Sequence, residues 1–274
     1  MDAAVDVRDA NAVNEVMART RPDAIAHLAA VSFSPDATAD PSSAMSVAVV
    51  GTVNVLEAAR LLEQTPAVLV TGSSEVYGLP ALDELPLREG SPLRAQSAYG
   101  VSKIAQESVA LAYSARYGQR LVVTRSFNHI GPMQRPEFVV PALARRVSEM
   151  ARGSAGSVPV GNVDVRRDFT DVRDVVRAYR LLLEAAHAGR LDASGTAVNV
   201  CSGRSVAIRW VAEELCRLAG VEPRLEVDPA LVRDSDAPEI RGDYAFLSAL
   251  TGWHPEIPLQ DTLRDVWSAN ECMK

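Results

Sequence analysis

Ser73, Tyr99 and Lys103 are the residues whose types and spacing best suit chemistry. Tyr99 and Lys103 lie four residues apart in a stretch with helical periodicity, so their side chains share one face. Because an ammonium beside a phenol favours the phenolate, we expect Lys103 to lower the pKa of Tyr99. A serine hydroxyl can hydrogen-bond a carbonyl oxygen. Together the three groups indicate proton transfer at a carbonyl or alcohol, as hydride chemistry requires.

The lysine count makes a chance pairing of Tyr99 with Lys103 uncommon. Only two of the 28 basic residues are lysines, and the other, Lys274, is the last residue of the chain. Ser73 stands two residues after the apolar run 67–71, at the carboxyl end of a predicted strand. Open parallel sheets bind their ligands at that edge.

The elements that must position these residues follow from short apolar runs that alternate with longer amphipathic stretches. The runs predict buried strands over 24–30, 67–71, 121–124 and 197–200. The amphipathic stretches predict helices over 47–62, 99–117, 138–152, 171–188, 205–219 and 259–270. Apolar strands without polar alternation, separated by helices, indicate an α/β fold with a parallel sheet that is covered on both faces.

Composition excludes several other classes of protein. The 274 residues include 47% apolar residues and carry a net charge of −7, without a basic block, so we expect no nucleic-acid partner. No uninterrupted apolar run approaches the ~20 residues of a membrane span, and we expect none. The acidic N-terminus is unlike a secretory signal. Three widely spaced cysteines, Cys201, Cys216 and Cys272, indicate free thiols in the cytoplasm and no metal site.

Six motifs resemble the extended short-chain dehydrogenase/reductase family, in its sugar-nucleotide branch. They are His-Leu-Ala-Ala at 27–30, the strand and loop at 70–78, Tyr-Gly-Val-Ser-Lys at 99–103, and the segments 125–132, 167–174 and 251–255. Asn-His-Ile-Gly-Pro at 128–132 is similar to the group of GDP-4-keto-6-deoxy-D-mannose reductases. The resemblance covers nearly the whole chain.

The resemblance implies a fold of two parts. It implies a Rossmann-like, doubly wound parallel sheet over 1–130, to which 169–200 returns, and a smaller sugar-nucleotide-binding lobe over 131–274. It also implies a homodimer in which the helices at 47–62 and 99–117 of two subunits form a four-helix bundle.

The resemblance also assigns roles to site residues. Tyr99 would protonate the C4 oxygen of a keto-sugar as hydride arrives from NADPH or NADH, and Ser73 would hydrogen-bond the same oxygen. Lys103 would bind the nicotinamide ribose, and Glu75 would assist near the sugar. The implied cofactor-binding residues are Asp6, Val7, Leu28, Ala29, Ala30, Tyr99 and Lys103. The implied substrate-binding residues are Ser74, Asn128, His129, Phe138, Val139, Arg167 and Arg233.

The sequence departs from the family at three places. The family's glycine-rich turn, which binds the cofactor pyrophosphate, should stand well upstream of Asp6, yet the first glycine here is Gly51. We therefore expect a Rossmann-like sheet that lacks its first strands, and we favour a truncated sequence over a shortened paralogue. Ala48 stands where the family usually has asparagine, and Met133 where the subgroup usually has glycine.

Three functions follow from these observations. The first is reduction of the C4 ketone of a GDP-linked 4-keto-6-deoxymannose to a GDP-6-deoxyhexose. The second is a 4-epimerase or 4,6-dehydratase, which returns the hydride to its product; Glu75 is compatible with a dehydratase. The third is a non-catalytic nucleotide-sugar-binding paralogue, which the missing phosphate-binding turn would favour.

Overall fold

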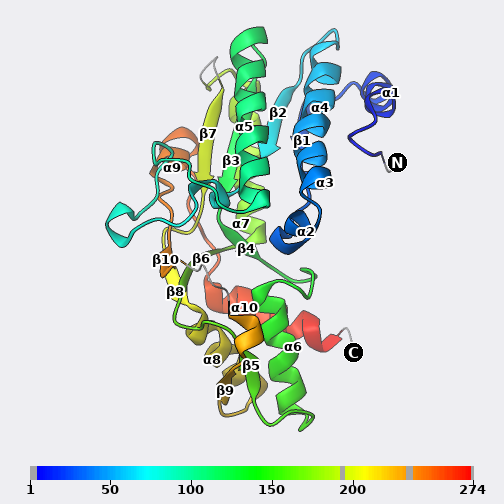
Figure 1. The fold of residues 1–274 in the computed structure, drawn as a ribbon. Coiled ribbons are helices and arrows are strands. Elements are labelled where there is room, and N and C mark those ends of the chain that lie inside the picture. Colours follow the sequence, from blue (N-terminus) through cyan, green and yellow to red (C-terminus); the bar gives the residue numbers. More distant parts are fainter. Residues whose placement is uncertain (1–4, 192–194, 233–236, 273–274) are drawn as a thin grey trace.

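Four parallel strands form the larger sheet of the computed structural model, which describes residues 5–191, 195–232 and 237–272. In spatial order they are β1 (Ala24–His27), β2 (Ala67–Thr71), β3 (Leu121–Ser126) and β7 (Thr196–Val200). Figure 1 shows their carboxyl ends pointing toward a second, smaller body of the molecule, which is built from residues after Phe127. The prediction of a parallel α/β sheet is confirmed, although the first strand ends at His27 rather than at residue 30.

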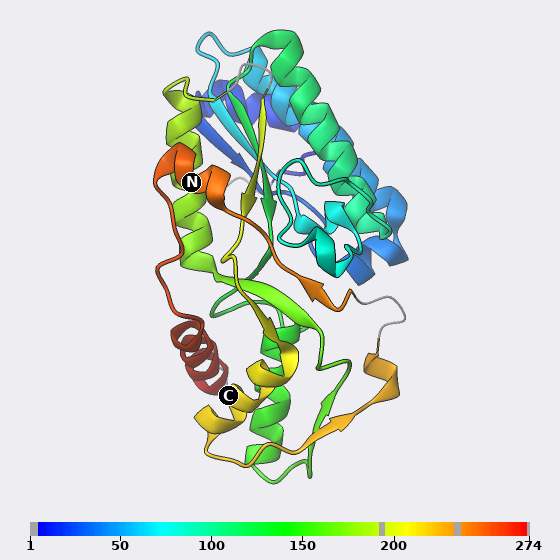
Figure 2. The same cartoon turned by 90° about the vertical axis from the view of Figure 1, so that its left-hand side faces the viewer.

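Both faces of the central strands β2 and β3 are buried, which explains why they are apolar without alternation. The first strand, predicted to be buried, instead exposes Ala24 and Ala26, because β1 lies at the edge of the described sheet. Val68 and Val70 pack toward α4 (Gly51–Arg60) and α5 (Ala98–Tyr117). Leu69 packs on the opposite face against α7 (Val172–His187). Helix α1 (Ala10–Thr20) packs against α4, and α9 (Ala245–Thr251) lies against α7 and β7 (Figure 2).

One helical stretch reaches the length of a membrane span, although it is not an uninterrupted apolar run. Pro41–Arg60, which comprises α3 (Pro41–Met45), a π-helical turn (Ser46–Val50) and α4, is long and apolar enough to cross a bilayer by length and composition alone. It packs against α1 and α5, and Leu56 is completely buried under the sheet. These contacts are those of a core helix. Ala48 is buried in the π-helical turn.

The second body, here called the lobe, is built from short strands and three helices. Its central strands are β4 (Asn128–Ile130), β6 (Arg166–Asp171), β8 (Ser205–Ala207) and β10 (Glu239–Ile240). A separate pair consists of β5 (Val158–Val160) and β9 (Leu225–Val227). The helices are α6 (Val139–Ala151), α8 (Ile208–Ala219) and α10 (Leu259–Cys272), and their apolar faces form one core. Short helices α2 (Ser34–Ala39), η2 (Ser74–Tyr77), η3 (Leu82–Glu84) and η4 (Pro229–Leu231) complete the chain.

The helix predicted over 205–219 begins later than expected. Residues 205–207 form strand β8, antiparallel to β6, and α8 starts at Ile208. The guanidinium of Arg166 donates to the Ser205 carbonyl at 2.6 Å, which adds to the strand ladder. Pairing with a distant strand therefore overrides the local helical pattern.

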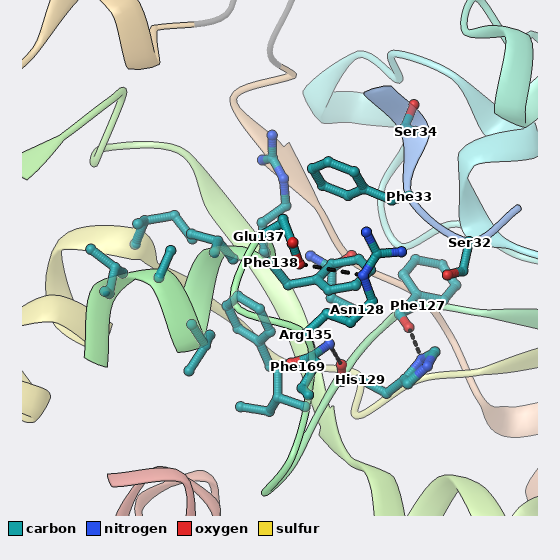
Figure 3. A pocket seen from close by; sticks show the side chains of 18 of the residues that line it. Ser32, Phe33, Ser34, Phe127, Asn128, His129, Arg135, Glu137, Phe138 and Phe169 are labelled. Atoms are coloured by element: carbon teal, nitrogen blue, oxygen red, sulfur yellow. Dashed lines mark hydrogen bonds and ion pairs between the residues drawn. The ribbon is translucent and has the colours of Figure 1, made fainter. Parts of the chain in front are cut away.

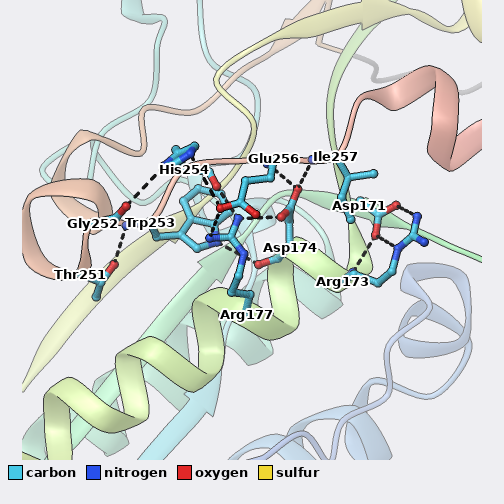
Figure 4. Close-up of polar contacts among 10 residues, drawn as sticks. All are labelled: Asp171, Arg173, Asp174, Arg177, Thr251, Gly252, Trp253, His254, Glu256 and Ile257. Carbon is cyan, nitrogen blue, oxygen red and sulfur yellow. Dashed lines mark hydrogen bonds and ion pairs between the residues drawn. The ribbon is translucent and has the colours of Figure 1, made fainter.

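A polar cluster joins the start of α7 to the segment that crosses between the two bodies (Figure 4). The buried Asp174 carboxylate accepts the backbone N–H groups of Glu256 and Ile257, each at 2.9 Å. The indole of Trp253, which is completely buried, donates to the Asp174 carbonyl at 3.0 Å. Arg177 bonds the Asp174 carboxylate at 2.7 Å. The motif at 251–255 therefore has a structural role as the anchor of the crossing segment.

Candidate active site

Ser73 stands at the carboxyl end of β2, where the chain turns sharply. Its hydroxyl accepts the backbone N–H of Glu75 at 3.2 Å and caps the short helix η2. Gly72 precedes it with no room for a side chain, because a Cβ there would lie 2.4 Å from the Thr124 carbonyl oxygen. This close approach to β3 fixes the turn and holds Ser73 at the sheet edge.

Helix α5 brings Tyr99 and Lys103 to the same edge. Ser97 caps the helix by accepting the Gly100 N–H at 2.9 Å, which places Tyr99 in the first turn. The Tyr99 hydroxyl interacts with the Ser73 side chain, and both residues line one pocket. The Lys103 ammonium lies 5.8 Å from the centre of the Tyr99 ring and is almost completely buried. The structure thus gathers the three residues that the spacing singled out.

The expected effect of Lys103 on Tyr99 is wrong for the chain by itself. Burial raises the pKa of Tyr99 to about 12, with smaller contributions from Glu75 and Tyr179, and outweighs the hydrogen bond from Ser73. Burial also lowers the pKa of Lys103 to about 8. Desolvation penalises both charged forms, and the spacing of residues in the sequence does not report it. At neutral pH Tyr99 is a protonated phenol, which is the form that donates a proton.

Glu75 lies on the pocket wall beside this group. Its carboxylate accepts the hydroxyl of Ser97 at 2.8 Å and that of Ser34 at 3.5 Å. It therefore ties the start of α5 to α2 at the mouth of the pocket. The same carboxylate faces the space in which a ligand would meet Ser73 and Tyr99.

The pocket has a volume of 680 Å³ and lies between the sheet edge and the lobe. Figure 3 shows aromatic side chains from both bodies around it. The residues predicted to bind substrate that line it are Ser74, Asn128, His129, Phe138, Val139 and Arg167. Arg233 lies outside the described residues.

Arg167 reaches this pocket from β6. One guanidinium nitrogen donates to the carbonyls of Arg166 and Ala237 at 2.8 and 2.9 Å. These contacts hold the planar group in place, and its geometry suits bidentate pairing with a phosphate. At the neighbouring strand β4, the His129 ring lies 3.2 Å from the Phe127 carbonyl and Asn128 is exposed to the pocket.

Sequence reasoning missed several lining residues. Phe33 meets Phe138 edge to face, with ring centres 5.4 Å apart, and the Arg135 guanidinium lies 5.7 Å from the Phe33 ring centre. Arg135 also pairs with Asp36 at 3.4 Å. Arg146 of α6 lines the deeper end and donates to the Pro159 carbonyl at 3.0 Å. The one available signal was the position of Phe33, three residues after the motif at 27–30, because the other residues lie in or after an irregular loop.

The residues predicted to bind the cofactor lie in three places. Leu28, Ala29 and Ala30 follow β1, Tyr99 and Lys103 belong to α5, and Asp6 and Val7 precede α1. Leu28 follows β1 with 59% of its side-chain surface exposed, and Ala29 and Ala30 are half-buried. Asp6 pairs with Arg8 at 2.6 Å on the surface, and Val7 packs against Gly51 of α4. Among the described residues, no group of three His, Cys, Asp or Glu side chains is placed to hold a metal ion.

A Rossmann-like parallel sheet with serine, tyrosine and lysine at its rim defines an extended short-chain dehydrogenase/reductase. The chain belongs to the GDP-mannose 4,6-dehydratase family, whose family model matches residues 3–266. It is 39% identical over 248 residues to the GDP-6-deoxy-D-mannose reductase of Pseudomonas aeruginosa, covering 90% of this chain and 80% of that protein. It is 26% identical to a GDP-mannose 4,6-dehydratase of Vibrio cholerae, covering 93% and 75% of the two chains.

Solved structures give the same family relationship. The structure of RMD from Pseudomonas aeruginosa complexed with NADPH superimposes with a TM-score of 0.91 at 35% identity, covering 99% of this chain and 89% of that one. The UDP-glucose 4-epimerase of Thermus thermophilus in complex with NAD superimposes with a TM-score of 0.84 at 26% identity, covering 97% and 83%.

Proposed function

We propose that the protein reduces the C4 ketone of GDP-4-keto-6-deoxymannose to a GDP-6-deoxyhexose, using NADPH or NADH. The observation that carries this is the placement of Ser73 and Tyr99 on one wall of a pocket whose other wall presents Arg167, with the buried Lys103 ammonium 5.8 Å from the centre of the Tyr99 ring. We assign residues 1–130 with 169–200 to cofactor binding, and residues 131–274 mainly to the sugar nucleotide. The similarity to a GDP-6-deoxy-D-mannose reductase supports this choice of substrate.

The residues at the sheet edge supply the acid chemistry. Tyr99, protonated at neutral pH, gives its phenolic proton to the C4 oxygen while the Ser73 hydroxyl hydrogen-bonds that oxygen. The Lys103 ammonium, 5.8 Å from the ring centre, stabilises the phenolate that results. NADPH or NADH, when bound, supplies the hydride. Its nicotinamide ribose would lie against Tyr99 and Lys103.

The rest of the cofactor fits the exposed end of β1. Leu28 offers an exposed apolar surface directly after the strand, and Ala29 and Ala30 are small enough for close approach. In this proposal Asp6 and Val7 lie toward the adenine. The related structure that carries NADPH supports a nicotinamide cofactor.

The lobe would hold the nucleotide. Arg167 binds the diphosphate through paired hydrogen bonds, and Arg233 is proposed as its partner. Ser74, Asn128 and His129 would contact the sugar, while Phe138 and Val139 would meet the base at the start of α6.

The test is to follow the absorbance of NADPH and of NADH with GDP-4-keto-6-deoxymannose as substrate. The proposal predicts oxidation of one of the two cofactors in proportion to product, and much slower oxidation with a dTDP-linked 4-keto-6-deoxy sugar. Absence of oxidation with both cofactors, in a preparation shown to be folded, would contradict it.

A 4,6-dehydratase is the second candidate, because Glu75 places a carboxylate on the pocket wall beside Ser74. A carboxylate at that place can remove a sugar proton, and the hydride would return to the product. GDP-mannose would then be converted to a 4-keto-6-deoxy sugar without net consumption of NADPH. Product analysis with GDP-mannose, with and without added NADPH, separates this function from the reductase, and an epimer of the substrate would identify an epimerase.

We further propose that the protein is a cytoplasmic homodimer that pairs the helices at 47–62 and 99–117. Helix α5 exposes Val101, Ser108 and Ala112 along one stripe, opposite the face that packs on the sheet. Ile104 of the same helix packs against the cluster around Val76 and so does not contribute to this stripe. Light scattering should give twice the chain mass for the wild type and the single mass for Ala112→Arg; a wild-type monomer would contradict the dimer.

A further inference from the structure

A closed circuit of hydrogen bonds includes Lys103, the lysine beside the candidate acid Tyr99. The Lys103 ammonium donates to the Thr71 carbonyl at 2.7 Å and to the Gln106 side-chain oxygen at 2.8 Å. The Gln106 amide nitrogen donates to the Thr52 hydroxyl at 2.9 Å, and that hydroxyl lies 3.0 Å from the His27 ring nitrogen. The Thr71 hydroxyl closes the circuit by donating to the His27 carbonyl at 3.1 Å.

The circuit spans four elements at the sheet edge and is shielded from water. His27 ends β1, Thr71 ends β2, Thr52 belongs to α4, and Lys103 and Gln106 belong to α5. The side chains of Thr52 and Gln106 have no exposed surface, and Lys103 has 2%. A buried glutamine is costly unless its amide is satisfied at both ends. Here the Gln106 amide oxygen accepts from the Lys103 ammonium, and the amide nitrogen donates to Thr52.

We propose that Gln106, Thr52 and His27 are positioning residues that hold the Lys103 ammonium against the sheet edge, oriented toward Tyr99. The two acceptors, Thr71 and Gln106, occupy two of the three N–H donors of the ammonium. The third donor is then available on the side of Tyr99, where the proposed function places the ribose of the cofactor. Thr52 keeps Gln106 in the accepting orientation, because its hydroxyl takes the amide N–H and faces His27 at the same time. The inference rests on the proposed function only in assigning Lys103 to catalysis.

The groups around Lys103 determine in which direction its pKa should change when the Gln106 contact is lost. Tyr99 faces it from the same helix and His27 faces it from β1, while β2 and α4 present the Thr71 carbonyl and the Thr52 hydroxyl. Burial, with the charge of Lys103, lowers the pKa of His27 to about 4, so the ring is neutral at physiological pH. An acceptor on an ammonium stabilises its charged form. Loss of the Gln106 contact therefore lowers the pKa of Lys103 further below its ordinary range.

The chain offers a direct way to measure this, because Lys103 and Lys274 are its only lysines. Protein labelled with carbon-13 at lysine Cε gives two NMR signals, and Lys274 serves as the internal reference. We expect Lys103 to titrate near pH 8 in the wild type. Gln106→Met should lower that midpoint by about one pH unit, and Thr52→Val by less, whereas Thr52→Ser should preserve it. Gln106→Glu should raise the midpoint, because it places a carboxylate on the ammonium.

These outcomes separate positioning from a merely structural role. Opposite shifts in Gln106→Met and Gln106→Glu, with Thr52→Ser like the wild type, support the circuit. An unchanged Lys103 midpoint in folded Gln106→Met and Gln106→Glu would overturn it, even if their melting temperatures fall. The titration needs neither cofactor nor sugar nucleotide, so a failure of the proposed function would show separately, as an absence of NADPH oxidation by the wild type.

Discussion

The two walls of the pocket are built in opposite ways. On the sheet side, Ser73 caps a helical turn, Tyr99 lies in the first turn of a long helix, and Lys103 is buried with two hydrogen-bonded acceptors. Each group there is held by regular secondary structure. A proton donor needs such fixed geometry, because a misplaced group loses most of its catalytic effect.

The lobe wall includes an irregular segment, residues 131–138, with charged side chains on its surface. Arg135 of this segment is about half exposed and pairs at 3.4 Å with the half-exposed Asp36 of α2. Met133 has 77% of its surface exposed and a φ of 68°, a left-handed conformation that side chains rarely adopt. Loops of this kind tolerate change. Under the proposed function, the sheet wall carries out the proton transfer and the lobe wall binds the nucleotide sugar.

The largest effect is expected from removing the proton donor on the sheet wall, Tyr99. Tyr99→Phe deletes the phenolic proton and should lower kcat by about 10²- to 10⁴-fold with little change in melting temperature. NADPH oxidation with GDP-4-keto-6-deoxymannose provides the measurement. Tyr117→Phe, at the far exposed end of the same helix, is the matched control and should keep full turnover. Turnover of Tyr99→Phe within about threefold of wild type would remove Tyr99 from the chemistry.

A change on the lobe wall should affect binding instead. Arg167→Ala removes a cation proposed to pair with the diphosphate, and the KM for the sugar nucleotide should rise about 10- to 100-fold with a smaller change in kcat. Arg166→Ala is the control, because the Arg166 side chain bonds Ser205 rather than lining the pocket. Equal effects of the two substitutions would contradict the role given to Arg167.

The pH dependence of kcat/KM tests which protonation states the groups on the sheet wall must have. Below about pH 8 the Lys103 ammonium is charged and Tyr99 is a neutral phenol, so both are in the form the reduction needs. As pH rises through about 8, Lys103 loses its proton, and kcat/KM should fall about tenfold per pH unit above that point. Tyr99, with a pKa of about 12, does not set this limb. A profile that stays flat well above pH 8 would show that Lys103 is not needed in its charged form.

The polar cluster around Asp174, here called the junction, joins the start of α7 to the crossing segment and should contribute to stability. Asp174→Asn removes the negative charge of a carboxylate whose Oδ2 accepts both N–H groups of the crossing segment and whose Oδ1 pairs with Arg177, and the free energy of unfolding should fall by about 1–3 kcal/mol. Denaturant titration measures this. Asp261→Asn, which breaks only an exposed pair with Arg264, should change it by less than about 0.5 kcal/mol. Similar losses in both variants would rule out a special role for the junction.

The smallest expected effect lies in the loop of the lobe wall. Met133→Gly relieves the left-handed strain and should raise the free energy of unfolding by up to about 1 kcal/mol. Met133→Ala keeps the strain and separates it from the loss of the side chain. A Gly variant no more stable than the Ala variant would show that the backbone is not strained there.

Sequence reasoning predicted the sheet wall because its signals are local. Apolar strands, a capped helix and the four-residue spacing of Tyr99 and Lys103 are all visible along the chain. Phe33 and Arg135 were missed because they meet only through tertiary contacts between the two bodies. Strand β8 was taken as helix because its partner β6 lies far away in the sequence. The direction of the Tyr99 pKa shift was wrong because burial cannot be read from spacing.

The central claim is that the site delivers a hydride and the Tyr99 proton to C4 of a GDP-linked keto-sugar. The most direct test is to incubate the protein with GDP-4-keto-6-deoxymannose and NADPH that carries deuterium at the transferable position. Mass spectrometry and NMR of the product should then show one deuterium, located at C4, for each NADPH oxidised. A product that forms without deuterium at C4, or without oxidation of NADPH, would contradict the account.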